Sequence, residues 1–97
     1  MTIRLSEIQI IPIKPQNGLV AFASFILDES LYLGSIAIMT RPNGGYRLVY
    51  PTKKVAERNL DIFYPINKEF SQVIENEVVR QFEDVMKKYD RHNSSNS

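Results

Sequence analysis

The chain has 97 residues, with 12 Lys or Arg against 11 Asp or Glu for a formal net charge of +1, and it contains no cysteine. A chain of this length forms one domain, and the lack of cysteine excludes disulfides, thiolate metal sites and thiol redox chemistry. The near-neutral net charge does not by itself indicate a nucleic-acid partner, so that question depends on where the charges lie.

The first predicted strand covers residues 3–14 and is rich in β-branched side chains. It is expected to end at Pro15. Its apolar periodicity shifts between Leu5 and Ile8, which predicts a β-bulge or a change of buried face there. The Asn-Gly pair at residues 17–18 is a strong signal for a tight hairpin turn, because both residue types tolerate positive φ angles.

Two further strands are predicted over residues 19–27 and 31–40, separated by a polar turn at residues 28–30. In both strands the residues of each face are largely apolar. An antiparallel strand with one face in water needs apolar residues on the other face only. We therefore expect both faces of this part of the sheet to be covered.

Residues 41–45 contain a proline, an Asn-Gly pair and a second glycine, which predict a tight loop. A fourth strand is predicted over residues 46–50 and should stop at Pro51, which cannot donate to a ladder. Residues 52–59 are expected to form a polar loop. Residues 60–66 form a short extended segment, and the sequence leaves open whether it pairs as a fifth strand.

A helix is predicted over residues 68–90, because Asn67 can cap it and Glu69 lies in the first turn, where the helix dipole favours an acid. One apolar stripe follows at three- and four-residue spacing. It consists of Phe70, Val73, Ile74, Val78, Phe82, Val85 and Tyr89. The stripe is interpreted as a packing face, since the polar side of the helix is acidic overall, unlike that of membrane-surface helices. Residues 91–97 are predicted to be a disordered polar tail, which leaves residues 1–90 as a single domain.

These elements predict an α+β fold, with an antiparallel sheet of four to five strands followed by a long C-terminal amphipathic helix. A single helix is only about 10 Å wide and covers part of one sheet face. The strands with two apolar faces therefore need a second cover, and another copy of the same chain can supply it. We expect a homodimer.

Positive charge is concentrated between residues 41 and 58, where five Lys or Arg and one acid, Glu57, give a local charge of +4. The five cations are Arg41, Arg47, Lys53, Lys54 and Arg58. One interpretation is that they neutralise nucleic-acid phosphates, which would make binding strongly salt-dependent. The other is an ordinary solvated loop, because such a density of cations is not rare in soluble proteins.

Two tyrosines, Tyr46 and Tyr50, share one face of the fourth strand, whereas Arg47 lies on the other face. Stacking of these rings on bases would suit single-stranded nucleic acid. Half-buried packing is the more common use of such tyrosines, and their separation from Arg47 also favours packing.

The sequence shows no catalytic constellation. The sole histidine, His92, lies in the predicted tail, and there is no Ser-His, Cys-His or metal-binding spacing and no glycine-rich phosphate loop before a helix. Asp28 and Glu29 are adjacent, so their side chains point apart, and they are interpreted as turn residues. We therefore expect no enzyme activity, and no cofactor, metal or small-molecule substrate.

No apolar segment approaches the roughly 18 residues that a membrane-spanning helix needs. The N-terminal residues also lack the apolar core of a signal peptide. We therefore expect a cytoplasmic protein without a membrane partner, a location with which the cysteine-free composition is compatible.

Four segments of the sequence together resemble the stage V sporulation protein G (SpoVG) family of bacterial septation and sporulation regulators. They are residues 21–28 (AFASFILD), 36–39 (IAIM), 44–54 (GGYRLVYPTKK) and 61–67 (DIFYPIN). In that family the third segment typically runs glycine, aromatic, two or three apolar residues, proline, serine or threonine, and two basic residues. The resemblance extends over roughly residues 5–90.

The resemblance implies a small α+β dimer that binds DNA site-specifically and affects transcription, septum formation or sporulation. Carried onto this chain, the basic pair is Lys53 and Lys54. The second position is more usually arginine, which reads guanine edges better than lysine does, so Lys54 is expected to contact phosphate. Tyr64, in place of the family's common histidine, also indicates a divergent member.

The function expected from these observations is that of a small, dimeric, DNA-binding regulator that contacts phosphates through a basic loop, with RNA left open as a ligand. The candidate nucleic-acid-binding residues are Lys53, Lys54, Arg58, Arg47 and Arg41. The alternative is a protein–protein interaction module that acts through a sheet edge or the dimer face without contacting nucleic acid.

Overall fold

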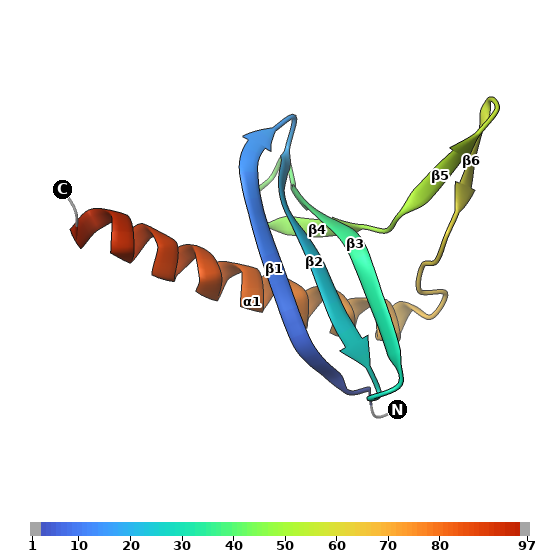
Figure 1. Ribbon diagram of the computed structural model, residues 1–97, viewed down its shortest axis with the longest axis horizontal. Helices are drawn as coiled ribbons and strands as arrows, with labels where there is room; N and C mark the ends of the chain where they lie inside the picture. The colour runs from blue at the N-terminus through green and yellow to red at the C-terminus, as the bar shows by residue number, and fades with distance from the viewer. Residues whose placement is uncertain (1–2, 96–97) are drawn as a thin grey trace.

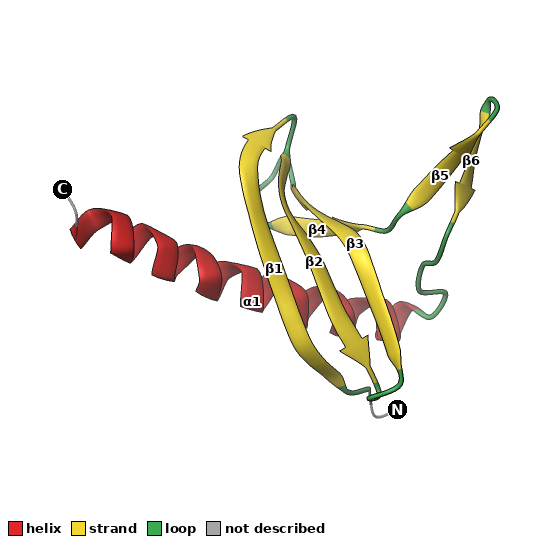
Figure 2. Ribbon diagram, viewed as in Figure 1, coloured by secondary structure: helices red, strands yellow, loops and turns green. Residues whose placement is uncertain are grey.

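The computed structural model describes the backbone of residues 3–95 and the side chains as far as residue 89. Four antiparallel strands form a meander, which is followed by a separate two-stranded hairpin and a long helix (Figure 1). The elements are β1 (Leu5–Gln16), β2 (Leu19–Leu27), β3 (Leu31–Thr40), β4 (Tyr46–Val49), β5 (Thr52–Val55), β6 (Arg58–Asp61) and α1 (Lys68–Ser95). The predicted α+β class is confirmed (Figure 2).

Short connections join the strands of the meander at the predicted places. Asn17 and Gly18 alone connect β1 to β2, with φ angles of 53° and 88°. Positive φ at both positions gives a turn whose twist matches that of the flanking strands. Residues 28–30 and 41–45 form the other two predicted connections, so the sheet order is β1-β2-β3-β4.

Strand β1 shows the predicted bulge but not the predicted end. Its register with β2 shifts between Ser6 and Gln9, and Glu7 between them has a φ of 48°. The strand then continues past Pro15 to Gln16, so the prediction that it ends at the proline is wrong. The proline is tolerated because β1 is an edge strand, where a missing N–H can face solvent.

Helix α1 begins at the predicted cap, since the N–H of Phe70 donates to Oδ1 of Asn67 at 2.8 Å. The helix continues to Ser95, beyond its predicted end, because no glycine or proline follows to interrupt it. Residues 91–95 therefore extend the helix, and residues 96–97 of the predicted tail lie outside the described residues. Within the described part of the chain, no helix has the apolar length that crossing a membrane requires.

One face of the sheet packs against α1 and forms the hydrophobic core. The buried core residues are Ala21, Ala23, Phe25, Ile36, Ile38, Ile74, Val78 and Phe82. They come from the central strands β2 and β3 and from the apolar stripe of the helix, as predicted. At β4, the ring of Tyr46 meets the ring of Phe82 edge-on, with centroids 4.9 Å apart.

The opposite face of the sheet, which we call the open face, also carries apolar side chains. The strand register aligns Ile11, Phe22, Ala37 and Val49 in one row across the four strands. Figure 1 is viewed onto this face, with α1 behind the strands and no described element in front of them. The apolar character of both faces is confirmed, whereas the covering of the second face by another chain stays a prediction.

The hairpin of β5 and β6 corrects the expected polar loop. Residues 52–59 form most of a second, two-stranded sheet, and residues 60–61 complete it rather than adding a fifth strand to the main sheet. The turn between the strands is Ala56-Glu57, where Ala56 adopts a φ of 57°. Alanine rarely takes this conformation, and the Asn-Gly signal that usually marks such a turn is absent. The sequence pattern therefore pointed to a loop.

Candidate nucleic-acid interface

The β5–β6 hairpin stands away from the main sheet and the helix (Figure 2). At its base, the N–H of Ile62 donates to the carbonyl oxygen of Pro51 at 3.1 Å and joins the two chain segments. Beside this bond, the rings of Tyr50 and Phe63 meet edge-on with centroids 6.0 Å apart, and both residues pack against the core. The hairpin is therefore held at its base, whereas every residue of its two strands is exposed.

The two lysines that are adjacent in the sequence lie on opposite faces of the hairpin. Directly opposite residues share a face, and the register places Lys53 opposite Leu60 and Val55 opposite Arg58. Lys53 and Arg58 therefore lie on one face together with these two apolar residues and no acid, and we call these four residues the basic face. Lys54 lies on the other face, which also carries Asp61, the last residue of β6.

Among the described side chains, the hairpin cations are not neutralised by ion pairs. The ion pairs among the described side chains are Arg4–Glu29, Arg41–Glu75 and Arg80–Glu77, and all of them lie outside the hairpin. Lys53, Lys54 and Arg58 take part in none of them, and all three are exposed. Their charge is thus accessible to an anionic ligand from solvent.

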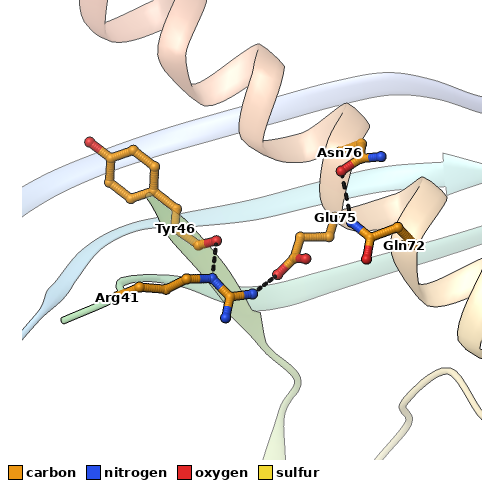
Figure 3. Close-up of polar contacts among 5 residues, drawn as sticks. All are labelled: Arg41, Tyr46, Gln72, Glu75 and Asn76. Atoms are coloured by element: carbon orange, nitrogen blue, oxygen red, sulfur yellow. Dashed lines mark hydrogen bonds and ion pairs between the residues drawn. The ribbon is translucent and has the colours of Figure 1, made fainter. Parts of the chain in front are cut away.

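Arg41 lies in the loop between β3 and β4 and is tied to helix α1 through Glu75 (Figure 3). Its Nη2 lies 2.9 Å from Oε1 of Glu75, and its Nε donates to the carbonyl oxygen of Tyr46 at 3.0 Å. Next to this pair on the helix, Gln72 donates to Asn76 at 2.9 Å. The Glu75 carboxylate offsets the charge of Arg41, which therefore links the β3–β4 loop to the helix.

Tyr50 lies at the joint between β4 and the hairpin. Burial, with a smaller effect from the Glu75 carboxylate, raises the pKa of Tyr50 to about 12. Its hydroxyl is buried and has no hydrogen-bond partner among the described residues. Tyr50 packs against Phe63 as Tyr46 packs against Phe82, so the predicted packing role of both tyrosines is confirmed.

Arg47 lies on the open face of the sheet and not on the hairpin. In the register it is opposite Met39, two residues before Val49, and its side chain is exposed. The five candidate cations thus occupy three places. Three of them lie on the hairpin, Arg47 lies on the open face, and Arg41 lies at the contact between a loop and the helix.

The open face also holds exposed residues that the sequence interpretation did not single out. Tyr32 is 68% exposed and Ile11 is 61% exposed, and together with Phe22 they line a shallow depression. The sequence signal for this surface is the alternation in β2, where Phe22 lies between Ala21 and Ala23, two residues of the core. Its significance depends on knowing which face of the sheet packs against the helix, which the pattern alone does not give.

Comparison with protein families finds a match over most of the chain. The SpoVG family model matches residues 1–84, a range that includes the main sheet, the hairpin and the first part of α1. No curated protein sequence matches the chain. The matched range contains all three hairpin cations and both faces of the sheet.

Proposed function

The chain belongs to the SpoVG family of septation and sporulation regulators, and from this premise we propose that it is a cytoplasmic regulator that binds nucleic acid through the β5–β6 hairpin. The family is one of regulators rather than enzymes. The observation that carries the proposal is the basic face. Lys53 and Arg58 are exposed there on a projecting ribbon, with no acid on that face and no ion-pair partner among the described side chains.

The arrangement of the hairpin cations suits contact with a sugar-phosphate backbone. Lys53 and Arg58 are diagonal neighbours across an antiparallel pair, a relation in which backbones lie about 7–8 Å apart. Both can therefore contact phosphates of one strand, while Lys54 reaches phosphates on the other side of the ribbon. Such contacts fix position without reading sequence, and each releases condensed counterions.

The proposal is tested by titrating labelled DNA with the protein at about 50 and about 200 mM salt. Replacing Lys53→Ala together with Arg58→Ala should weaken binding about tenfold or more at the lower salt, because two charged contacts are lost. For duplex DNA, the slope of log K against log salt should become shallower by about 1.8, at about 0.9 per contact. Circular dichroism of the variant checks that the fold is kept.

A matched control replaces Arg4→Ala together with Arg80→Ala, which removes the same total charge from residues that are paired elsewhere. We expect this control to leave the salt slope unchanged. Equal losses in both double variants would mean that binding follows net charge alone and would contradict the role of the hairpin. No binding at low salt would remove the proposal and favour the protein-interaction alternative, for which Val55 and Leu60 are exposed on the basic face.

We also propose that the protein acts as a homodimer through the end of the helix. The 28 residues of α1 span about 42 Å, whereas four strands span about 14 Å between their outer axes. The C-terminal part of α1 therefore extends past β1 (Figure 1). A groove of about 1020 Å³ lies between them, lined on its apolar side by Ile13, Val20, Val85, Met86 and Tyr89.

A second copy that contributes the same helix end would cover this groove in both molecules, because a two-fold interface uses one surface twice. The dimer would also carry two hairpins, so that two sets of phosphate contacts act on one nucleic acid and raise its apparent affinity. Sedimentation analysis should give twice the chain mass for the wild-type protein. A monomeric mass would contradict the dimer.

Met86→Glu tests the location of the interface, because it places a charge inside the groove. We expect this variant to sediment as a monomer. The control is Lys87→Gln, which makes the same change in net charge at the neighbouring exposed position. A Met86→Glu protein that stays dimeric would show that the copies associate through another surface.

A further inference from the structure

The depression on the open face is lined by apolar, aromatic and uncharged polar residues. Its volume is about 380 Å³, and its lining residues include Gln9, Ile11, Phe22, Ser24, Tyr32 and Ser35. None of these residues carries a charge. The rings come from the two central strands, with Phe22 on β2 and Tyr32 on β3.

The ring of Tyr32 lies along the sheet over Gly34, two residues further on the same strand. A Cβ placed on Gly34 would be 2.8 Å from Oη of Tyr32 and 3.0 Å from its Cε2. The ring can occupy this position only because Gly34 has no side chain. It therefore presents an exposed aromatic surface over the backbone of β3.

The polar side chains around the depression can serve a ligand that has both donors and acceptors. Gln9 carries an amide, and Ser24 and Ser35 carry hydroxyls. None of the side-chain hydrogen bonds found among the described residues uses these groups. A purely apolar side chain seated there would bury polar groups without partners, at a cost in free energy. A flat ring with hydrogen-bonding edges can contact both the aromatic and the polar side chains of this lining.

The depression is connected to the hairpin through the row of residues across the sheet and through β4. Phe22 is in register with Ala37 and Val49, and Val49 is the last residue of β4, just before the segment that enters the hairpin. Arg47 lies on the same open face of β4. The open face is thus joined through β4 to the segment that enters the hairpin, and Arg47 adds a positive charge to this face.

We propose that this depression binds an unpaired nucleobase of the nucleic acid whose phosphates the hairpin contacts. Bases stack on exposed aromatic rings of a sheet and are recognised through their polar edges. A base inside a duplex is stacked and paired, so the site selects single-stranded segments. This inference rests on the proposed function, since the hairpin supplies the phosphate contacts and the depression supplies the base contact.

The test compares two single strands of equal length and charge, an oligothymidine and the same strand with abasic residues at its centre. We expect the wild-type protein to bind the oligothymidine about 5- to 150-fold more tightly, the range expected for one stacked base. Tyr32→Ala should abolish this difference and leave binding of the abasic strand unchanged. Tyr64→Ala, at an exposed tyrosine outside the depression, is the control and should keep the difference.

A second variant, Gly34→Val, keeps the tyrosine but displaces its ring from the sheet. It should also abolish the preference for the strand with bases, whereas Tyr32→Phe should keep it. Equal binding of both strands by the wild-type protein would overturn this inference and leave the hairpin proposal standing. Binding of neither single strand would also overturn this inference, and the titration with duplex DNA would then decide the hairpin proposal. If Tyr32→Ala changes the sedimenting mass but not the base preference, the open face is an interface between copies and the inference is wrong.

Discussion

The main sheet and the β5–β6 hairpin differ in the burial and in the charge of their side chains. In the main sheet, residues such as Phe25, Ile38 and Val78 are fully buried between the strands and α1, and no charged side chain is among the buried residues there. In the hairpin, every strand residue is exposed and three of the eight are cations. A charge buried in the core would need a partner, whereas a charge on the exposed hairpin stays hydrated.

The comparison shows that the buried core and the exposed hairpin cations are separated along the chain. An isolated two-stranded hairpin is marginally stable in water. This one is held at its base by the Ile62–Pro51 hydrogen bond and by the packing of Tyr50 on Phe63. The joint between the regions should therefore be sensitive to mutation, whereas the strands of the hairpin should accept changes with little effect on folding.

The largest expected difference between the regions is in the cost of removing an apolar side chain. Phe25→Ala should lower the free energy of unfolding by about 3–5 kcal/mol, because it leaves a cavity in the core. Val55→Ala on the hairpin should cost less than about 0.5 kcal/mol. Urea denaturation of the two variants measures both values. Similar costs would break the comparison and show that the hairpin packs against a surface of its own.

Alkaline pH should act on the joint through Tyr50. Burial raises its pKa from 10.0 to about 12, so the folded chain keeps a proton that the unfolded chain releases near pH 10. The contribution is fully present below pH 10 and is lost progressively as the pH rises from 10 toward 12. Unfolding followed from pH 9 to 12 should show stability falling in this window. Tyr50→Phe should remove that part of the pH dependence, and an unchanged profile in the variant would contradict this assignment.

Amide side chains offer a matched test of the two regions. Asn67→Ala removes the oxygen that accepts the N–H of Phe70 and should lower the free energy of unfolding by about 1 kcal/mol. Asn59→Ala on the exposed strand β6 should change it by less than about 0.5 kcal/mol. Denaturation midpoints of both variants provide the measurement. A larger effect at Asn59 would assign the hairpin a structural role that its exposure does not indicate.

The smallest expected effect concerns Arg41, the candidate cation that the structure places in the body of the protein. Glu75→Gln breaks its ion pair and should cost about 0.2–1 kcal/mol, because both side chains are partly exposed. Glu77→Gln, which breaks the Arg80 pair on the same helix, is the control and should have a similar effect. The salt dependence of DNA binding should be the same in both variants. A steeper dependence in Glu75→Gln alone would show that released Arg41 contacts phosphate.

Local patterns in the sequence were sufficient for most of the main sheet and for the start of the helix. The Asn-Gly turn at residues 17–18 and the cap at Asn67 depend on backbone conformations and hydrogen bonds between near neighbours in the chain. The hairpin could not be found in this way. Its turn at Ala56 adopts a conformation that local preference does not favour, and its two strands are short and polar.

The sequence by itself determined the α+β class, the order of the first four strands, the amphipathic helix and the concentration of cations between residues 41 and 58. These properties follow from periodicity, capping and composition, which act over a few residues. Only the tertiary structure decided how those cations are distributed. Strand pairing puts Lys53 beside Arg58 and turns Lys54 to the other face, while packing of the β3–β4 loop on α1 gives Arg41 a carboxylate partner. Which side chains lie close together in the folded protein depends on strand register and packing. Neither property follows from which residues are adjacent in the sequence.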